Sequence, residues 1–559
     1  MNLSRRHMLQ LALAQAALPR ALAQDLAPTA SRVYPGSDGR LAYAPDEQGN
    51  VIHDASHAGF GGGGAALPWV PVAETVWPVA GDNAEHLQSA IDRVSSLPLD
   101  GNGFRGAVLL RAGYYPLATS LRIQASGVVL RGEGMEDTGS VLIGQRAAST
   151  DGGRGGPAPG GRGRGRGRGG FGGGQTRLIS IGGESGAVPD ESGRQAIVDD
   201  YVPVGARSVR VASARGFRPG DPIVVRRIGN QDWIDAVGMS AGSTASPWRP
   251  FDVDWDRVVV DVAGNTLTFE APITCAIEQR WGGGIVMACD DAGRIENVGI
   301  ENLRGVSEFD PTVRTRNYGN MDRPNYAAEE YYADEAHYRD FVGLGNVRNA
   351  WVRNAAALHF VNSMVGTERG SKWITIQVCV SREPVSMRAG GRRFTFALRG
   401  QLALVQRCHS DEGRHSFMAG QPTGSGNVFL DCRATRAFSS SEPHEQWATG
   451  TLYDNVHAPL TARYWKDFVI GWAGANTVFW NCEGDFLVQQ PPTAQNYSFG
   501  HIGVNAVIFN TEFQDLSKPN GHIESLDRHV SPRSLYLAQL GDRLGEAAAR
   551  RIATPDQLA

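Results

Sequence analysis

The sequence contains no long apolar segment beyond its N-terminus. A helix that crosses a bilayer needs about 20 consecutive apolar residues, and no stretch after the N-terminal segment approaches that length. The apolar run that ends at Leu18 is itself too short to span a membrane. We therefore expect no integral membrane segment in the mature chain.

An excess of charge of one sign is also lacking. The 54 lysines and arginines nearly balance the 58 aspartates and glutamates, for a net charge of −4. This balance gives no electrostatic reason to expect nucleic acid or an anionic membrane as a partner. The length of 559 residues exceeds one ordinary core and suits an elongated repeat or several domains.

Cysteine is sparse, and its spacing is not that of a metal site. The six cysteines include no C-x-x-C pair, which argues against metal binding by thiolates. Four of them share one position, at or near the end of a short apolar run: Cys379, Cys408, Cys432 and Cys482. This shared position predicts an inward-facing ladder of buried thiols. Disulfide bonds in an exported chain are the alternative.

The N-terminus has the features of an export signal. Arg5 and Arg6 precede the apolar run, and Ala21-Leu22-Ala23 is a small-x-small cleavage site. Paired arginines are typical of twin-arginine signals, although a general secretory signal with a chance arginine pair would look similar. We predict that residues 1–24 are a signal peptide and that the protein is periplasmic or secreted.

The rest of the chain divides into segments of different composition. Short β-like runs split by Gly, Asn and Ser turns recur from Arg294, and Cys408 and Cys432 are 24 residues apart. A period in the low twenties predicts one coil of a parallel β-helix per repeat. The predicted segments are an N-terminal arm (25–80), the start of the β-helix with a helical cap (81–150), a disordered Gly/Arg-rich insert (151–177), an inserted small β subdomain (203–275), the main β-helix (290–530) and a C-terminal helical cap (531–559).

Some side chains in these segments admit two interpretations. Trp233, Trp248 and Trp255 of the β subdomain either stack on sugar rings or close a small core. The asparagines at the run ends, Asn302, Asn354 and Asn510, predict a ladder that caps the turns. The amphipathic C-terminal segment is expected to cover the open end of the solenoid.

A motif near the start of the β-helix carries a family resemblance. Its residues are Gln88, Ala90, Ile91, Asp92, Gly106, Val108, Gly113, Tyr115, Leu130, Arg131, Gly132 and Gly134. This pattern resembles the entry cap of the pectate-lyase-like right-handed β-helix superfamily, with the usual proline of the middle element replaced. The resemblance implies an all-β fold, a right-handed parallel β-helix with an N-terminal helical cap, to which the sequence pattern adds the inserted small β subdomain and the C-terminal helical cap. It says little about the reaction, because lyases, hydrolases and phage tailspikes share the motif.

A second resemblance lies in the C-terminal half. The segments GGRRF, GRHSF, PHEQWATGTLYDN, GWAGANTVFWNC and PPTAQNY resemble a group of secreted β-helix proteins labelled pectate-lyase-like. In that pattern an aspartate, a His-Arg pair and a histidine stand where this chain has Ser416, Glu445-Gln446 and Ile470. These exchanges imply altered specificity or lost activity.

The candidate site lies in residues 409–466, where imidazole, guanidinium and carboxylate groups are concentrated. β-Elimination of a uronate polysaccharide needs a cation for the sugar carboxylate, a base and an acid, which arginine, histidine and tyrosine can supply. The predicted catalytic residues are His415, His444, Tyr453, Arg414 and Arg463. The predicted substrate-binding residues are Arg393, Glu442, Trp447, Lys466, Trp472 and Asn496. Each of these side chains could instead have a purely structural role.

The sequence therefore predicts an exported enzyme that degrades a polysaccharide, in the first place a lyase that cleaves an acidic glycan. A β-helix glycoside hydrolase is one alternative. Such an enzyme needs two carboxylates, and the segment offers Asp411, Glu412, Glu442, Glu445 and Asp454 as candidates. A non-catalytic glycan-binding protein is the other. No cofactor is expected to be required, although acidic pairs such as Asp290-Asp291 and Glu329-Glu330 leave Ca²⁺ binding open.

Overall fold

The structure is a computed structural model that describes residues 28–146, 177–316, 329–422, 424–506 and 513–558. The predicted signal peptide, nearly all of the Gly/Arg-rich insert and Asn510 lie outside these residues. Among the described residues, no helix is long and apolar enough to cross a membrane.

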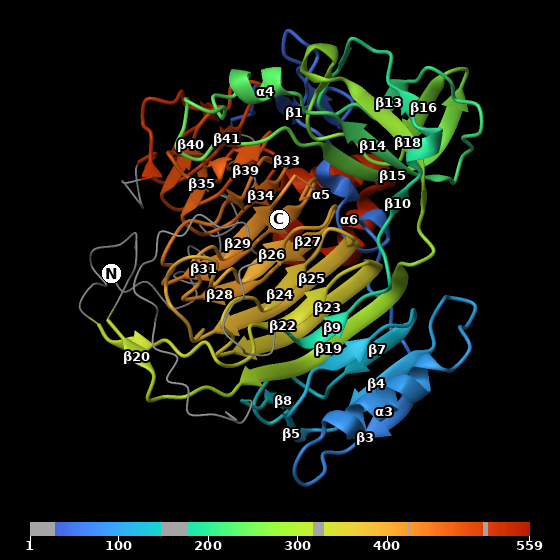
Figure 1. Ribbon diagram of the computed structural model, residues 1–559, viewed down its shortest axis with the longest axis vertical. Helices are drawn as coiled ribbons and strands as arrows, with labels where there is room; N and C mark the ends of the chain where they lie inside the picture. The colour runs from blue at the N-terminus through green and yellow to red at the C-terminus, as the bar shows by residue number, and fades with distance from the viewer. Residues whose placement is uncertain (1–27, 147–176, 317–328, 423, 507–512, 559) are drawn as a thin grey trace, which may run out of the picture.

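Two parallel sheets, formed by alternating segments of the chain, build the main body (Figure 1). In hydrogen-bonding order, the long sheet contains β3 (Val72–Val76), β4 (Gly106–Leu110), β7 (Val128–Arg131), β19 (Ile295–Ser307), β23 (Val347–Leu358), β25 (Lys372–Arg382), β27 (Leu404–Gln406), β30 (Val428–Leu430), β34 (Leu452–Asp454), β39 (Val478–Trp480), β41 (Tyr497–Phe499) and β42 (His522–Glu524). The second sheet contains β6 (Leu121–Ile123), β9 (Arg177–Ile181), β22 (Asp340–Leu344), β24 (Val365–Thr367), β26 (Phe396–Leu398), β29 (Phe417–Gly420) and β32 (Pro443–His444). Each coil passes from one sheet to the other, so the predicted right-handed parallel β-helix is confirmed.

Each coil bends at a residue with left-handed backbone angles, either within its long strand or directly after its short strand of the long sheet. The φ values of these residues lie between 49° and 54°, at Asn302, Asn354, Val378, Arg407, Asp431, Asn455 and Asn481. Asparagine tolerates this conformation better than most residues, which explains its frequency in the column. Asn354 Nδ2 donates a hydrogen bond to Asn302 Oδ1 at 3.0 Å. The predicted asparagine ladder is thus confirmed for these two residues.

The interior of the β-helix contains the predicted ladder of thiols. Cys379, Cys408, Cys432 and Cys482 each follow a bend residue directly, and all four are buried as free cysteines. The thiol of Cys432 lies 3.5 Å from the carbonyl oxygen of Val405 in the preceding coil. The alternative of disulfide bonds is therefore wrong for these residues.

The burial of the thiols predicts their reactivity. Only Cys289 among the six is partly exposed, and burial raises its pKa to about 12, so a thiol reagent at pH 8 should modify at most this residue, slowly. After unfolding in guanidinium without reductant, all six should react. A reagent titration with mass spectrometry measures both numbers. Fewer than six reactive thiols in the unfolded chain would contradict the free-thiol ladder.

Helices cover different parts of the β-helix than the sequence suggests. α3 (Ala84–Ser95) covers the first coils and buries Leu87, Ala90, Ile91 and Val94, as its periodicity predicts. The C-terminal helices α5 (Leu535–Leu544) and α6 (Glu546–Ile552) do not cap the end of the solenoid. They pack, together with the N-terminal arm, against outward-facing apolar side chains of the long sheet such as Val428 and Leu452. This packing corrects the expectation of an end cap. Its physical reason is that the outward-facing apolar side chains of the long sheet are stabilised when the helices remove them from water.

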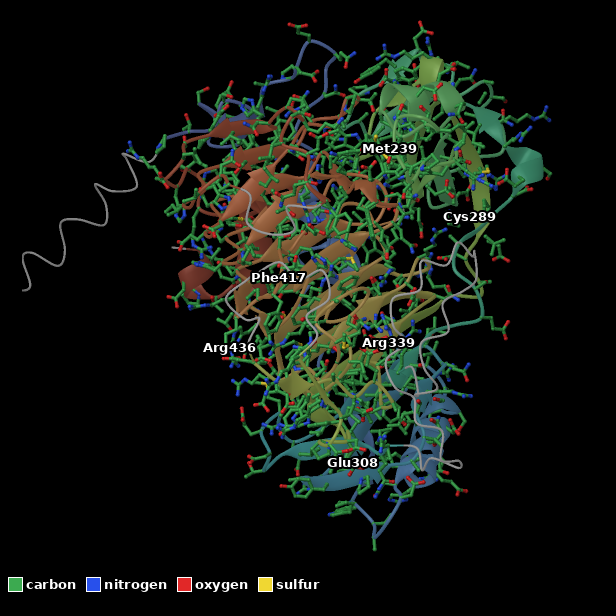
Figure 2. The ribbon with its side chains drawn as sticks, turned by 60° about the vertical axis from the view of Figure 1, so that its left-hand side comes forward. Met239, Cys289, Glu308, Arg339, Phe417 and Arg436 are labelled. Carbon is green, nitrogen blue, oxygen red and sulfur yellow. The ribbon has the colours of Figure 1, made fainter. Side chains whose placement is uncertain are left out.

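The inserted subdomain is an antiparallel sheet beside the β-helix; Figure 2 marks it by Met239, and β29 of the β-helix by Phe417. Its strands are β10 (Val188–Pro189), β18 (Gly284–Asp290), β14 (Pro222–Arg227), β15 (Val253–Ala263), β16 (Thr266–Phe269) and β13 (Ser208–Arg210). It thus extends past both ends of the predicted segment 203–275. Trp233, Trp248 and Trp255 are buried in its core, so they pack the subdomain and cannot stack on a sugar.

Candidate active site

Four polar side chains meet on the outer side of the second sheet, near its C-terminal end. The register between β29 and β32 pairs Gly420 with His444, and a bridge from Ser441 to Leu460 brings in β35 (Leu460–Ala462), which Arg463 follows. We call His415, Glu442, His444 and Arg463 the His–Glu cluster. Three coils thus supply one group of side chains, although up to 48 residues separate them in the chain.

Glu442 is the centre of the cluster. Its Oε1 accepts a hydrogen bond from Nδ1 of His444 at 2.6 Å, and its Oε2 accepts one from Thr461 Oγ1 at 2.5 Å. The Nε of Arg463 lies 3.7 Å from the same oxygen. Burial alone would raise the pKa of this carboxyl, but the surrounding imidazoles and the guanidinium outweigh burial and lower the pKa below its usual range. Glu442 is therefore ionised at neutral pH.

The two imidazoles are held in defined tautomers. The Nδ1 of His415 lies 2.6 Å from the carbonyl oxygen of Ser440, so this nitrogen carries the proton. Burial, reinforced by Arg414, lowers the pKa of His415 well below 6.5, and its Nε2 has no hydrogen-bond partner among the described residues. His444 likewise donates from Nδ1, to Glu442. Both rings therefore keep the Nε2 lone pair for another partner.

Aromatic side chains pack around the cluster. The ring of Phe394 lies 5.0 Å from that of His415 and 5.1 Å from that of His444, and the guanidinium of Arg463 lies 3.8 Å above Trp465. His415, Glu442 and Arg463 have side-chain exposures of 1% or less, whereas His444 is 8% exposed. His444 is thus the least buried side chain of the cluster.

A pocket of about 340 Å³ opens beside the end of β32. It is lined by Arg369, Gln421, Pro422, Glu445, Gln446, Val469 and Ile470. Three of the positions that differ from the resembling secreted proteins are in this list: Glu445, Gln446 and Ile470. Arg369 is oriented by a hydrogen bond from its Nε to Gln421 Oε1 at 2.9 Å. We call this cavity the site pocket.

The cluster also offers donor atoms to a metal ion. One ligand atom from each of His415, Glu442 and His444 lies within 4.8 Å of the others. Two nitrogens and one oxygen suit a transition metal better than Ca²⁺, which prefers oxygen ligands, and the adjacent Arg463 opposes any cation. Among the acidic pairs considered for Ca²⁺, Asp291 is ion-paired with Arg294 at 3.2 Å.

Several of the predicted residues lie away from the cluster. Tyr453 points into the β-helix, where its ring stacks on Phe429 and its hydroxyl donates to the carbonyl oxygen of Phe417 at 3.0 Å. It is fully buried and cannot act on a substrate, which corrects its assignment as catalytic. The reason is the alternation of β34, which turns this side chain inward and its neighbours outward.

The predicted tryptophan platforms are also buried. Trp447 packs edge-on against Trp233 at 5.1 Å, and Trp472 donates from Nε1 to the carbonyl oxygen of Val237 at 2.9 Å. Both join the inserted subdomain to the β-helix, because large apolar rings gain most from such an interface. Asn496 is buried as well, and its Nδ2 donates to the carbonyl oxygens of Gly474 and Gln489. These three assignments to substrate binding are therefore corrected.

The remaining predicted residues flank the cluster. Arg393 is buried, donates to Ser386, and has a pKa lowered to about 9 by burial and then by a neighbouring arginine. Its carbonyl oxygen accepts from the backbone of Arg414, whose guanidinium donates to Gly390. Lys466 is exposed on the loop after Trp465. The charge of Arg414 also contributes to the lowered pKa of His415.

Sequence reasoning missed some members of the site. Phe394, Ser440, Thr461, Trp465 and Arg369 enclose or orient the cluster and the pocket. Ser440 and Thr461 are 21 residues apart, close to one coil. This spacing is the signal that could have placed them together.

Comparisons with known proteins give no family. No family model matches this chain, and no curated protein matches it. Among solved structures, the tailspike of Acinetobacter baumannii bacteriophage AP22, in complex with a capsular saccharide, is similar over 76% of this chain and 56% of its own, with 13% identity and a TM-score of 0.38. The tailspike of E. coli bacteriophage HK620, in complex with a pentasaccharide, is similar over 85% and 61%, with 11% identity and a TM-score of 0.27. An iota-carrageenase complexed with iota-carrageenan fragments is similar over 78% and 58%, with 11% identity and a TM-score of 0.25.

The chain thus spans less than two thirds of the length of each of these three proteins. A likeness at such identities does not extend to activity, because one fold hosts many functions.

Proposed function

We propose that this chain is an exported enzyme that degrades an acidic polysaccharide, and that it acts as a lyase by β-elimination. The observation that carries the proposal is the pair of Glu442 and His444, in which a fully buried carboxylate holds an imidazole that keeps a small exposed fraction of 8%. The pair lies at the end of a strand, beside a pocket that an arginine lines.

The pair supplies the proton chemistry of an elimination. The Nε2 of His444 takes the proton from C5 of a uronate unit, the electrons of that C–H bond form the C4=C5 double bond, and the C4–O4 bond breaks. The imidazolium returns its proton to the leaving O4, so His444 is regenerated as a neutral base. Glu442 stabilises the imidazolium in between, and Arg369 binds the uronate carboxylate and thereby makes the C5 proton more acidic.

A glycoside hydrolase fits the same residues less well. Its general acid must hold a proton at neutral pH, which needs a raised pKa, whereas the pKa of Glu442 is lowered. Asp454 lies under α5, where it accepts a hydrogen bond from the backbone of Tyr536. Asp411 is ion-paired with Arg436.

A substrate panel tests the proposal. The purified protein is incubated with polygalacturonate, alginate, a glycosaminoglycan and a neutral glucan, and absorbance near 235 nm records the unsaturated product. We expect absorbance to rise on an acidic polymer and to stay flat on the glucan. New reducing ends without this absorbance would indicate hydrolysis. Binding with neither signal would indicate the non-catalytic alternative.

A further inference from the structure

A second cavity, remote in sequence from the His–Glu cluster, lies where four parts of the chain meet. Its volume is about 400 Å³. The N-terminal arm, the inserted sheet, β25 and α5 all contribute to its lining, which consists of His57, Gly61, Gly62, Arg207, Val258, Val260, Glu270, Trp373 and Arg543. We call it the arm cavity. It shares no lining residue with the site pocket.

The walls of the arm cavity are held by hydrogen bonds across its parts. Arg543 of α5 donates from Nε to Ser56 Oγ at 2.7 Å and from Nη2 to the carbonyl oxygen of Gly62 at 2.8 Å. The backbone of Gly61 donates to Asn349 Oδ1 of β23 at 3.1 Å. These bonds fix the arm before a ligand arrives, so binding would cost little ordering.

The lining of the cavity carries two guanidiniums and one carboxylate. Arg207 is exposed and Arg543 is half-buried; burial lowers the pKa of Arg543, Asp54 opposes this change, and the charge of Arg207 adds to it. Glu270, the carboxylate of the lining, is ion-paired at 2.8 Å with Lys372, which also pairs with Asp256 at 3.1 Å. Two guanidiniums that repel one another at one cavity gain free energy from an anion placed between them.

Two further side chains suit a sugar. Trp373 is half-buried and lines the cavity with its indole, whose ring is held by the ammonium of Lys372 at 4.2 Å. An indole offers an apolar surface to the C–H groups of a pyranose ring. Burial lowers the pKa of His57 despite Asp54, whose carboxylate lies 3.4 Å away. A neutral imidazole can exchange hydrogen bonds with hydroxyl groups.

We propose that the arm cavity is a second binding site for an acidic sugar unit, in which Arg207 and Arg543 bind the carboxylate or sulfate and Trp373 packs against the ring. The site would hold a polymer at a distance from the His–Glu cluster. The inference rests on the proposed function only for its substrate class, an acidic polysaccharide. That the ligand carries an anionic group and a ring is inferred from the residues of the cavity itself.

The test measures binding without turnover. The His444→Ala protein is mixed with trigalacturonate, with the neutral maltotriose or with inorganic sulfate, and hydrogen–deuterium exchange is followed by mass spectrometry. We expect trigalacturonate to slow exchange in residues 55–64, 203–210 and 540–545, and maltotriose to leave them unchanged. The additional Arg207→Ala substitution should weaken this binding at least about tenfold in calorimetry, because it removes a charged hydrogen-bond donor. Arg210→Ala, at another exposed arginine on the neighbouring strand, should leave it unchanged.

Each outcome decides the matter. Unchanged exchange in all three segments, or equal affinity after Arg207→Ala, overturns the second site. Binding of sulfate as tight as that of trigalacturonate overturns its assignment to a sugar. Slowed exchange at the arm cavity in a protein that cleaves no polysaccharide would support the second site and refute the proposed lyase activity.

Discussion

Replacing His444 by alanine is expected to lower kcat/KM on the acidic polymer about 10²–10⁴-fold, the usual contribution of a positioned general base. His444 is the least buried member of the cluster, and its Nδ1 is held by a buried carboxylate. The change removes the base but leaves the carboxylate and Arg463 in place. Initial rates at 235 nm on the polymer that the wild type cleaves measure the loss, and a melting curve shows that the variant is folded.

The chain offers a matched control for this substitution. His457 also pairs with a glutamate, since its Nδ1 lies 3.2 Å from Glu483, but their side chains are 49% and 39% exposed. His457→Ala should retain wild-type rates. If His444→Ala were as active as His457→Ala, the assignment of the base would be wrong.

Replacing Glu442 by alanine is expected to cost about 3–5 kcal/mol in the free energy of unfolding, because it removes the buried carboxylate that faces the buried guanidinium of Arg463 and accepts from His444 and Thr461. Glu442 and Arg463 have side-chain exposures of 0% and 1%, so water cannot replace the lost carboxylate. Urea titrations at pH 7 measure the difference. Glu483→Ala, which breaks the exposed pair, should cost at most about 1 kcal/mol.

The pH dependence distinguishes a charge effect from a loss of packing. The pKa of Glu442 is lower in the folded chain than its ordinary value of 4.5. The carboxylate therefore stabilises the fold above pH 4.5, and this contribution is lost as the pH falls below that value. The difference between wild type and Glu442→Gln should be large at pH 7 and smaller at pH 3.5. A difference that does not vary with pH would mean that Glu442 acts through packing.

The repeat could be predicted from the sequence because it is local. The short apolar runs, the asparagines at their ends and the 24-residue step from Cys408 to Cys432 each report one coil. The same step places His415 and His444, which are 29 residues apart, on successive coils but not at matching points, since the register pairs His444 with Gly420. Their rings lie 4.5 Å apart in the structure.

What could not be predicted depends on contacts between distant segments. Trp447 and Trp472 look like exposed platforms until the inserted sheet brings Trp233 and Val237 against them. The direction of Tyr453 depends on the phase of a strand of three residues, too short to show an alternation. The position of the C-terminal helices could not be predicted for the same reason, because the outward-facing apolar residues that they cover are spread over many coils.

The packing of the N-terminal arm and α5 on the long sheet bears on how the solenoid comes apart. A repeat protein is quasi-one-dimensional and tends to fray from its ends, one repeat at a time. Here Gln539 accepts from the backbone of Ala55, and Tyr536 donates to the carbonyl oxygen of Ala58, so both ends of the chain are tied to each other over the middle coils. Loss of an end coil then also weakens these contacts between the N-terminal arm and α5. These contacts thus link coils that do not touch each other. They make unfolding of the solenoid more cooperative than contacts between neighbouring coils alone would make it.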